Sequence, residues 1–174
     1  MSSWVVRFVA PWLLAAVAAS VATAAPVSEP SPVAVLPFLS VTEDEYSVAP
    51  TRDEVASVTL QVRRGLASAP PHFTVLPQSR VTSDRCGDAE CARRIGRALG
   101  AHVVVFGSVV RFAGIRWNTE VSAVDVRSGR LVDRLTYGVF GDYDSLLNAV
   151  REVGACLAQS IAGAAHCKAR PPAI

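Results

Sequence analysis

The chain has 174 residues, of which 51% are hydrophobic and 18% are charged. Its 17 basic and 15 acidic side chains leave a formal charge of +2. This near balance gives no electrostatic reason to expect nucleic acid or an anionic membrane surface as the ligand. The length favours a single domain built on one hydrophobic core.

The first 24 residues have the outline of a secretory signal peptide. A single charge at Arg7 precedes an almost continuously apolar stretch over residues 8–21, and a run of small residues follows. Ala22 and Ala24 satisfy the small-x-small rule for signal cleavage, so we expect the chain to be cut after Ala24.

An uncleaved membrane anchor is the alternative. The apolar stretch is interrupted by Pro11 and is shorter than the roughly 20 residues that a spanning helix needs, so we expect no stable membrane insertion after cleavage. Because no cysteine lies near the cleavage point, a lipid-anchored form is not expected. The mature chain would begin at Ala25, contain 174 − 24 = 150 residues, and be periplasmic or secreted.

The mature chain is predicted to contain a tether, one domain and a tail. Residues 25–32 carry three prolines, which fix the backbone and remove hydrogen-bond donors, so this segment should be extended. The domain is predicted over residues 33–163. Residues 164–174 include a proline pair and are not expected to continue a helix.

Apolar periodicity alternates between strand and helix types along the domain. Strands are predicted at residues 33–39, 72–77, 102–112, 115–126 and 130–140. Helices are predicted from the capping box of Thr51 and Glu54 to Leu66, from an Asp88 cap to Gly100, and from Asp142–Ser145 to near Gly163. Two helical crossovers make the first three strands parallel, and two short turns make the last three an antiparallel meander. The predicted fold class is α/β, a five-stranded mixed sheet flanked by three helices.

The strand predicted at residues 115–126 alternates between apolar and polar side chains, as a half-solvated strand does. Its apolar side is predicted to carry Ile115, Trp117, Val121 and Ala123, and its polar side Arg116, Asn118, Glu120 and Ser122. The best candidate contact surface on the regular elements consists of Arg116, Asn118, Glu120, Arg134 and Thr136. A solvated sheet face with cross-strand charge pairs is the alternative explanation.

Two cysteines flank the start of the second predicted helix, in the stretch RCGDAEC. In an exported chain the pair favours a disulfide, because a bend at Gly87 and a helix cap at Asp88 would let Cys86 and Cys91 meet. A redox-active pair is disfavoured, since four residues rather than two separate the thiols and nearby carboxylates oppose thiolate formation. A metal site would need histidines from scattered segments, and none is predicted.

Cys156 and Cys167 form the second expected disulfide. On an unbroken helix they would share a face but lie about 16 Å apart, so a bond requires the helix to stop near Gly163 and the tail to fold back. A reactive or metal-binding pair of His166 and Cys167 is the alternative.

No catalytic constellation is recognised, and no cofactor is predicted. Ser108 follows Gly107 in the middle of a strand, whereas a nucleophile elbow needs glycines on both sides of the serine at a strand-to-helix turn. The glycines of IGRALG lie on and after a helix and do not form a phosphate-cradling loop. The chain is therefore not expected to be an enzyme.

Three stretches, VAVLPF, IGRALGAHVVVFGSVVR and VDVRSGRLV, together resemble the amino-terminal domain of TolB and its relatives. They especially resemble a secreted bacterial family of unknown function in which a cysteine pair precedes the IGRALGA-type helix. The resemblance covers Val33 to Ile161. It implies an exported α/β module of envelope protein assemblies, with envelope proteins as partners. The β-propeller of full TolB and a lipobox cysteine are not found here, so neither the Tol complex nor a lipoprotein role is carried over.

The leading hypothesis is a non-catalytic exported binding or adaptor module of the cell envelope. A small exported enzyme or thiol-redox protein that uses the cysteine pairs is the alternative. A third hypothesis places a small-ligand crevice at the carboxyl ends of the parallel strands, where open α/β sheets bind ligands. Glu43, Asp44, Glu45 and the loop from Gln78 to Asp84 would line such a crevice.

Overall fold

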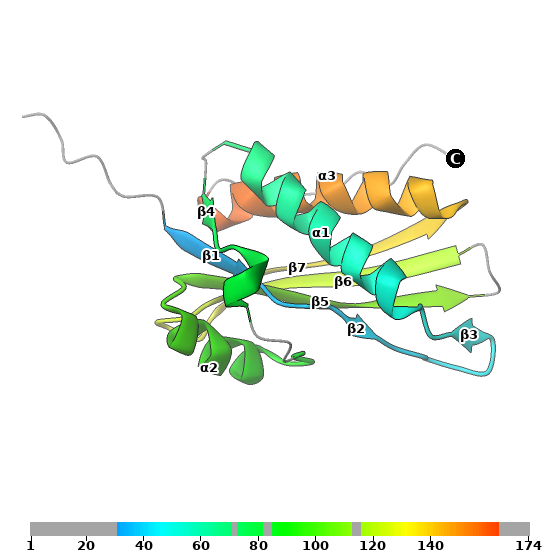
Figure 1. Ribbon diagram of the computed structural model, residues 1–174, viewed down its shortest axis with the longest axis horizontal. Coiled ribbons are helices and arrows are strands. Elements are labelled where there is room, and N and C mark those ends of the chain that lie inside the picture. The colour runs from blue at the N-terminus through cyan, green and yellow to red at the C-terminus, as the bar shows by residue number, and fades with distance from the viewer. Residues whose placement is uncertain (1–30, 71–72, 82–84, 113–115, 164–174) are drawn as a thin grey trace, which may run out of the picture.

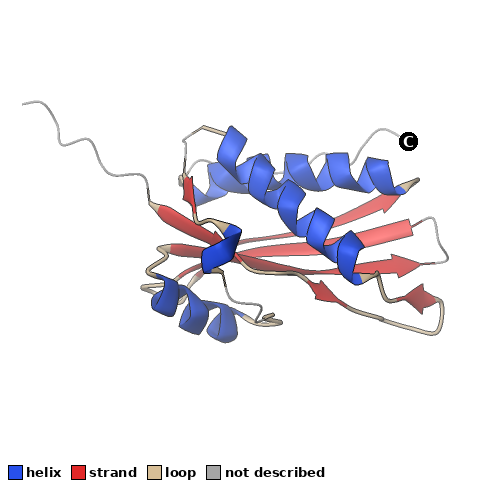
Figure 2. Cartoon of the chain, viewed as in Figure 1, coloured by secondary structure: helices blue, strands red, loops and turns tan. Residues whose placement is uncertain are grey.

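The computed structural model describes residues 31–70, 73–81, 85–112 and 116–163. Helices cover both faces of a mixed sheet (Figure 1). Helices α1 (Arg52–Ser68) and α3 (Tyr143–Ile161) pack against each other on one face. Helix α2 (Ala89–Leu99) lies on the other face and covers only one end of it, as the colouring by secondary structure makes plain (Figure 2).

The main path of the sheet has the order β4-β1-β5-β6-β7. These strands are β1 (Pro32–Val35), β4 (Thr74–Val75), β5 (Val103–Phe112), β6 (Arg116–Asp125) and β7 (Leu131–Phe140). β1 runs parallel to both β4 and β5, and β5, β6 and β7 follow one another antiparallel. The predicted α/β class, with three parallel strands and an antiparallel meander, is confirmed.

Two further short strands bring the sheet to seven. β2 (Leu39–Ser40) pairs parallel with β5, and β3 (Ser47–Val48) pairs antiparallel with the end of β5. The sequence prediction missed both as separate strands, because two-residue strands have too few positions for a periodic pattern.

The predicted strand 33–39 is divided at Pro37. Val35 lies opposite Val105 and Leu39 opposite Ser108, so three residues between β1 and β2 face two on β5. Pro37 has no amide hydrogen to give to the sheet. The next amide, that of Phe38, donates instead to the Thr59 hydroxyl on α1 at 3.2 Å. This interruption opens the sheet edge beside α1.

The larger part of the core lies between the sheet and the α1–α3 layer. It includes Val33, Val35, Phe38, Val58, Val62, Val105, Val121, Leu146, Val150 and Leu157. A smaller cluster lies under α2 and includes Ala34, Leu36, Cys86, Ile95, Val104, Phe106 and Val124. α1 and α3 approach closely at Gly65 and Gly154, where an added methyl group on either residue would collide with the backbone of the other helix.

The prediction that Ser122 belongs to a solvated side of β6 is wrong. Ser122 is fully buried, and its neighbour Val124 on the same face packs in the α2 cluster. The α2 helix covers this end of the face, which a pattern within one strand cannot reveal. Thr119 keeps the alternation in burial, because it lies fully buried on the α1–α3 side with Trp117 and Val121, although its side chain is polar. Only the first half of β6 is half-solvated.

The helix ends agree with the sequence signals. Thr51 and Glu54 form the complete capping box of α1, and Asp88 and Asp142 accept amide hydrogen bonds as the caps of α2 and α3. Gly100 ends α2 with φ of 68°, in the left-handed region. No helix in the described residues is long and apolar enough to cross a membrane.

A disulfide joins Cys86 and Cys91, with Cα atoms 5.5 Å apart. It links the loop before α2 to the first turn of the helix, as expected from RCGDAEC. Cys156 on α3 is also disulfide-bonded. Cys167, its expected partner, lies outside the described residues, and so do the tail 164–174 and the signal and tether segments except the last residues of the tether.

Candidate functional site

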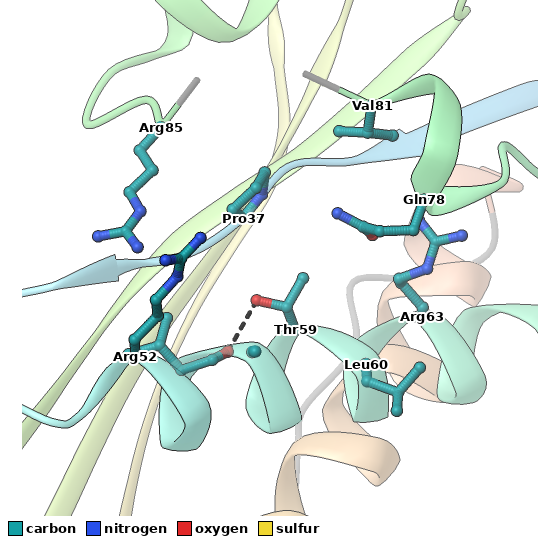
Figure 3. Close-up of a pocket in the computed structure, with 10 residues that line it drawn as sticks. Pro37, Arg52, Thr59, Leu60, Arg63, Gln78, Val81 and Arg85 are labelled. Carbon is teal, nitrogen blue, oxygen red and sulfur yellow. Dashed lines mark hydrogen bonds between the residues drawn. The ribbon is translucent and has the colours of Figure 1, made fainter. Parts of the chain in front are cut away.

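A groove lies beside α1, at the carboxyl ends of the parallel strands β1 and β4 (Figure 3). Its volume is about 510 Å³. One wall is a face of α1 that includes the buried residues Val55 and Thr59 as well as exposed ones. The other is formed by Pro37 at the sheet edge, by Gln78 and Val81 around a short 3-10 turn (Gln78–Arg80), and by Arg85. Carboxyl ends of parallel strands are the usual binding edge of open α/β sheets.

The α1 wall follows from helical periodicity. Six residues at spacings of three and four line the groove: Arg52, Val55, Ala56, Thr59, Leu60 and Arg63. Arg52 and Arg63 lie 11 residues apart, which is about 16 Å along a helix. The groove is therefore elongated, with apolar side chains between two arginines.

The α1 wall is fixed at its amino-terminal end by Glu54. Its carboxylate accepts from the Thr51 amide at 2.7 Å and pairs with Arg111 of β5 at 3.1 Å. Its backbone carbonyl accepts from the Tyr143 hydroxyl at 2.9 Å, which ties α1 to α3. Glu54 lies about 200° around the helix from Arg52, so its carboxylate is directed away from the groove.

The opposite wall is held by the disulfide. Arg85 immediately precedes Cys86, which is 1% exposed and packed in the α2 cluster. The bond from Cys86 to Cys91 fixes the backbone next to Arg85 relative to α2. The disulfide was predicted only as a link at the start of the second helix. In the structure it also positions a side chain of the groove.

Three arginines give the groove its charge. The Arg63 guanidinium donates to the Leu76 carbonyl oxygen, and its Nη1 is buried without a hydrogen-bond partner among the described residues. Burial lowers the pKa of Arg63, because a partly dehydrated cation is less stable than one in water. Arg52 and Arg85 are exposed and make no ion pair within the described part of the chain.

Figure 3 shows how these side chains divide the groove. Arg52 and Arg85 extend toward each other on one side of Pro37, while Arg63 and Gln78 lie on the other side. Guanidinium groups stay protonated and donate paired hydrogen bonds to carboxylates and phosphates. The chemistry that this lining can perform is therefore the binding of anionic groups.

The contact surface predicted from the sequence lies elsewhere, on the part of the sheet that α2 leaves open. Pairing of β6 with β7 places Glu120 opposite Thr136 and Asn118 opposite Gly138. Arg134 Nε lies 3.4 Å from Glu120 Oε1 and donates to the Ser122 hydroxyl at 3.3 Å. We call this surface the polar face, and define it by Arg116, Asn118, Glu120, Arg134 and Thr136.

The remaining arginine of the polar face is stacked between two aromatic rings. The Arg116 guanidinium carbon lies 5.3 Å from the centre of the Phe112 ring and 5.4 Å from that of Phe140. Phe140 is 62% exposed. The structure thus brings the predicted residues onto one surface and gives both arginines partners within the chain.

The crevice hypothesis predicted the place of the groove but only part of its lining. Gln78 lines it. The acidic residues Glu43, Asp44 and Glu45 do not, because they belong to the turn between β2 and β3, where Asp44 accepts from the Tyr46 amide. Residues 82–84 lie outside the described residues.

No family model and no curated protein matches the chain. Solved structures do match. The LpoB C-terminal domain from Salmonella enterica aligns with a TM-score of 0.46 and 18% identity over 63% of this chain and 82% of that domain. TolB from Acinetobacter baumannii aligns with a TM-score of 0.47 and 12% identity. The alignment covers 77% of this chain but only 28% of TolB. A PelC dodecamer from Paraburkholderia phytofirmans aligns with a TM-score of 0.48 and 18% identity. The alignment covers 78% of this chain and 89% of the PelC chain. TolB, whose amino-terminal domain the sequence motifs resemble, is among these structures.

The groove arginines were missed in the sequence because they come from separate segments. Arg52 and Arg63 do carry a signal: a separation of 11 residues returns to nearly the same helix face, here with apolar residues between them. Arg85 carries none, since its position depends on how the disulfide loop packs beside α1.

Proposed function

We propose that the chain is an exported, non-catalytic binding module of the cell envelope and that the groove beside α1 is its principal binding site. The observation that carries this proposal is the set of three arginines around one apolar groove, for which the described residues supply no carboxylate. Cations left without a partner in a concave, partly apolar site favour an anionic ligand.

Export is supported by two independent features. Residues 1–24 have the pattern of a cleaved signal. Disulfides such as Cys86–Cys91 persist in oxidising compartments and are rare in the cytosol. Cell fractionation with amino-terminal sequencing tests this: we expect a mature chain that begins at Ala25 in the periplasmic or extracellular fraction. A full-length chain in the cytosol would contradict it.

A thiol-redox function is the alternative, and titration of thiols separates it from the binding function. We expect no reactive thiol before reduction, because Cys86 is buried and bonded to Cys91. A pair that cycles at the potential of periplasmic oxidoreductases would support the alternative. Peptide mapping in the same experiment tests the proposed link between Cys156 and Cys167.

The polar face is proposed as a second contact surface. The observation in its favour is Arg116, which lies between Phe112 and the exposed Phe140, because arginine and aromatic residues are enriched where partners bind. Its alternative remains a solvated face stabilised by the pair of Arg134 and Glu120.

Photo-crosslinking in cells tests the groove as the binding site. A photoreactive amino acid replaces Leu60, which is 44% exposed and lines the groove. The control replaces Arg94, an exposed residue on α2 that does not line it. We expect an adduct from position 60 that disappears in the Arg52→Gln, Arg85→Gln double variant. The same adducts from both positions, or none from position 60, would count against the proposal.

A further inference from the structure

The charges of the groove lie at its two ends, and this arrangement restricts the ligand. Arg52 and Arg85 share one end, and Arg63 with Gln78 marks the other. Between them the lining is mostly apolar: Pro37, Val55, Ala56, Leu60 and Val81. The one polar residue there, Thr59, has its hydroxyl bonded to the Phe38 amide and the Val55 carbonyl. A ligand that satisfies the whole groove needs two anionic groups separated by an apolar group.

The length of the groove matches a short extended peptide. Arg52 and Arg63 are separated by about 16 Å along α1. An extended chain rises about 3.3 Å per residue, so residues four positions apart lie about 13 Å apart, and long acidic and arginine side chains supply the remaining reach. Side chains at positions one, three and five of an extended segment point to the same side. Acidic side chains at positions one and five would reach the two ends, and an apolar side chain at position three would lie over the middle.

We propose that the groove binds an extended segment of a partner protein that carries two acidic side chains four positions apart with an apolar side chain midway between them. This inference rests on the proposed binding function and names the chemistry of the partner. A compact anion such as phosphate fits less well, because it engages one end and leaves the apolar middle unfilled.

The two ends are expected to differ in strength. Arg52 and Arg85 are exposed, so water weakens their attraction for a carboxylate. Arg63 is partly buried and is held by the Leu76 carbonyl, so its guanidinium is already oriented and partly dehydrated. The Arg63 end should therefore contribute more of the affinity, and the Arg52–Arg85 end more of the salt dependence.

Nuclear magnetic resonance titration with defined peptides tests the inference. The probe is an acetylated, amidated pentapeptide of sequence glutamate–serine–leucine–serine–glutamate. One control peptide moves the second glutamate to position four, which turns it to the opposite side of an extended chain. Another replaces both glutamates by glutamine. Inorganic phosphate is titrated separately. The amide signals of Thr59, Leu60 and Gln78 report on the groove, and those of Glu120 and Thr136 on the polar face.

We expect the probe to shift the groove signals alone. It should bind about tenfold more tightly than the shifted peptide, which loses one charged hydrogen-bonding pair, and more tightly still than the glutamine peptide, which loses both. Arg52→Gln and Arg63→Gln should each weaken binding about tenfold or less on the same basis. Arg64→Gln, an exposed change on the same helix outside the groove, should leave the affinity unchanged. Because Arg63→Gln also removes a bond to Leu76, Arg63→Lys keeps the charge and serves as the second variant.

Equal affinity for the probe and the shifted peptide would overturn the inference, and so would an equal loss in Arg64→Gln. Saturable phosphate binding without peptide binding would also overturn it, in favour of a small-anion site. These failures remain distinguishable from failure of the proposed function. If groove-dependent crosslinking at position 60 persists while the peptide fails, only the stated peptide chemistry is wrong.

Discussion

The groove beside α1 and the polar face of β6 and β7 both carry arginines, but these arginines differ in the partners that the chain provides for them. On the polar face Arg134 pairs with Glu120, and Arg116 is stacked between two phenylalanine rings. In the groove Arg52 and Arg85 have no acidic partner within the described residues. The chain itself supplies partners for the arginines of the polar face. It supplies no acidic partner for Arg52 and Arg85 within the described residues, so a ligand can pair with them.

This difference separates arginines that have partners within the chain from arginines that are available to an anionic ligand. Arg111 belongs to the first kind as well, because it pairs with Glu54 and lies over the Trp117 ring. Its contacts hold the first turn of α1 against β5, and that turn carries Arg52. The paired arginine thus positions the one without an acidic partner.

The largest expected effect concerns the scaffold that supports the groove. Gly65→Ala would push a methyl group into the backbone of α3 near Arg151 and Gly154, on the side of α1 that faces α3. We expect the free energy of unfolding to fall by about 3 kcal/mol, because backbone cannot move aside as a side chain can. Ala67→Ser, an exposed change on the same helix, should alter it by less than about 0.5 kcal/mol. Urea denaturation measures both, and a similar small change in each would refute the close-packing account.

A smaller loss of stability is expected when the disulfide is removed. The Cys86→Ser, Cys91→Ser double variant should lose about 2 kcal/mol of unfolding free energy, because the bridge closes only a short loop. Its structural effect should be confined to one surface. We expect shifted amide signals at Gln78 and Arg85 and unchanged signals at Glu120. Equal disturbance of the polar face would show that the bridge does not act on the groove wall in particular.

A still smaller effect is expected on the polar face. Glu120→Gln removes the partner of Arg134 from a pair in which both side chains are about half exposed, 41% and 53%. Exposed pairs contribute little, so the unfolding free energy should fall by no more than about 0.5 kcal/mol. Probe binding in the groove should not change. A loss above about 1 kcal/mol would mean that this pair is stronger than solvent exposure allows.

Acid titration should have the smallest effect and should act on the β6–β7 hairpin rather than the groove. The Ser128 hydroxyl and amide both donate to Asp125 at 2.6 Å, and these bonds lower the pKa of that carboxyl. A lowered folded-state pKa stabilises the fold above the ordinary aspartate pKa, and this stability is lost as the pH falls through the folded value. Asp125→Asn should remove this contribution to the pH dependence of stability. Thermal denaturation of both proteins at a series of acidic pH values would measure the difference.

Much of the scaffold could be predicted from the sequence, because it depends on local signals. The Thr51–Glu54 capping box, the Gly100 end of α2 and the start of α3 at Asp142 each depend on a few neighbouring residues, and all three are confirmed. Ser122 could not be placed, since its burial depends on α2 lying across a distant strand. The strands β2 and β3 were missed for the same reason, as each exists only through pairing with β5.

The candidate site was harder to predict than the fold. Arginines on a helix and in a loop look like ordinary solvated charges in a sequence of nearly balanced charge. They stand out only in the structure, where Arg52 and Arg63 of α1 and Arg85 of the disulfide loop line one cavity beside the break at Pro37. The polar face could be predicted because its residues alternate along two strands that follow each other directly in the sequence.

The most direct test of the central claim compares partner capture by two double variants with matched charge removal. Arg52→Gln with Arg85→Gln removes the two arginines at one end of the groove, and Arg116→Gln with Arg134→Gln removes the two arginines of the polar face. Each variant also carries the photoreactive amino acid at position 60, and yields of the crosslinked adduct are compared with the parent protein in cells. The account predicts that the groove variant loses most of the adduct while the polar-face variant retains it. Retention in the groove variant, or equal loss in both, would contradict the claim that the arginines without partners form the binding site.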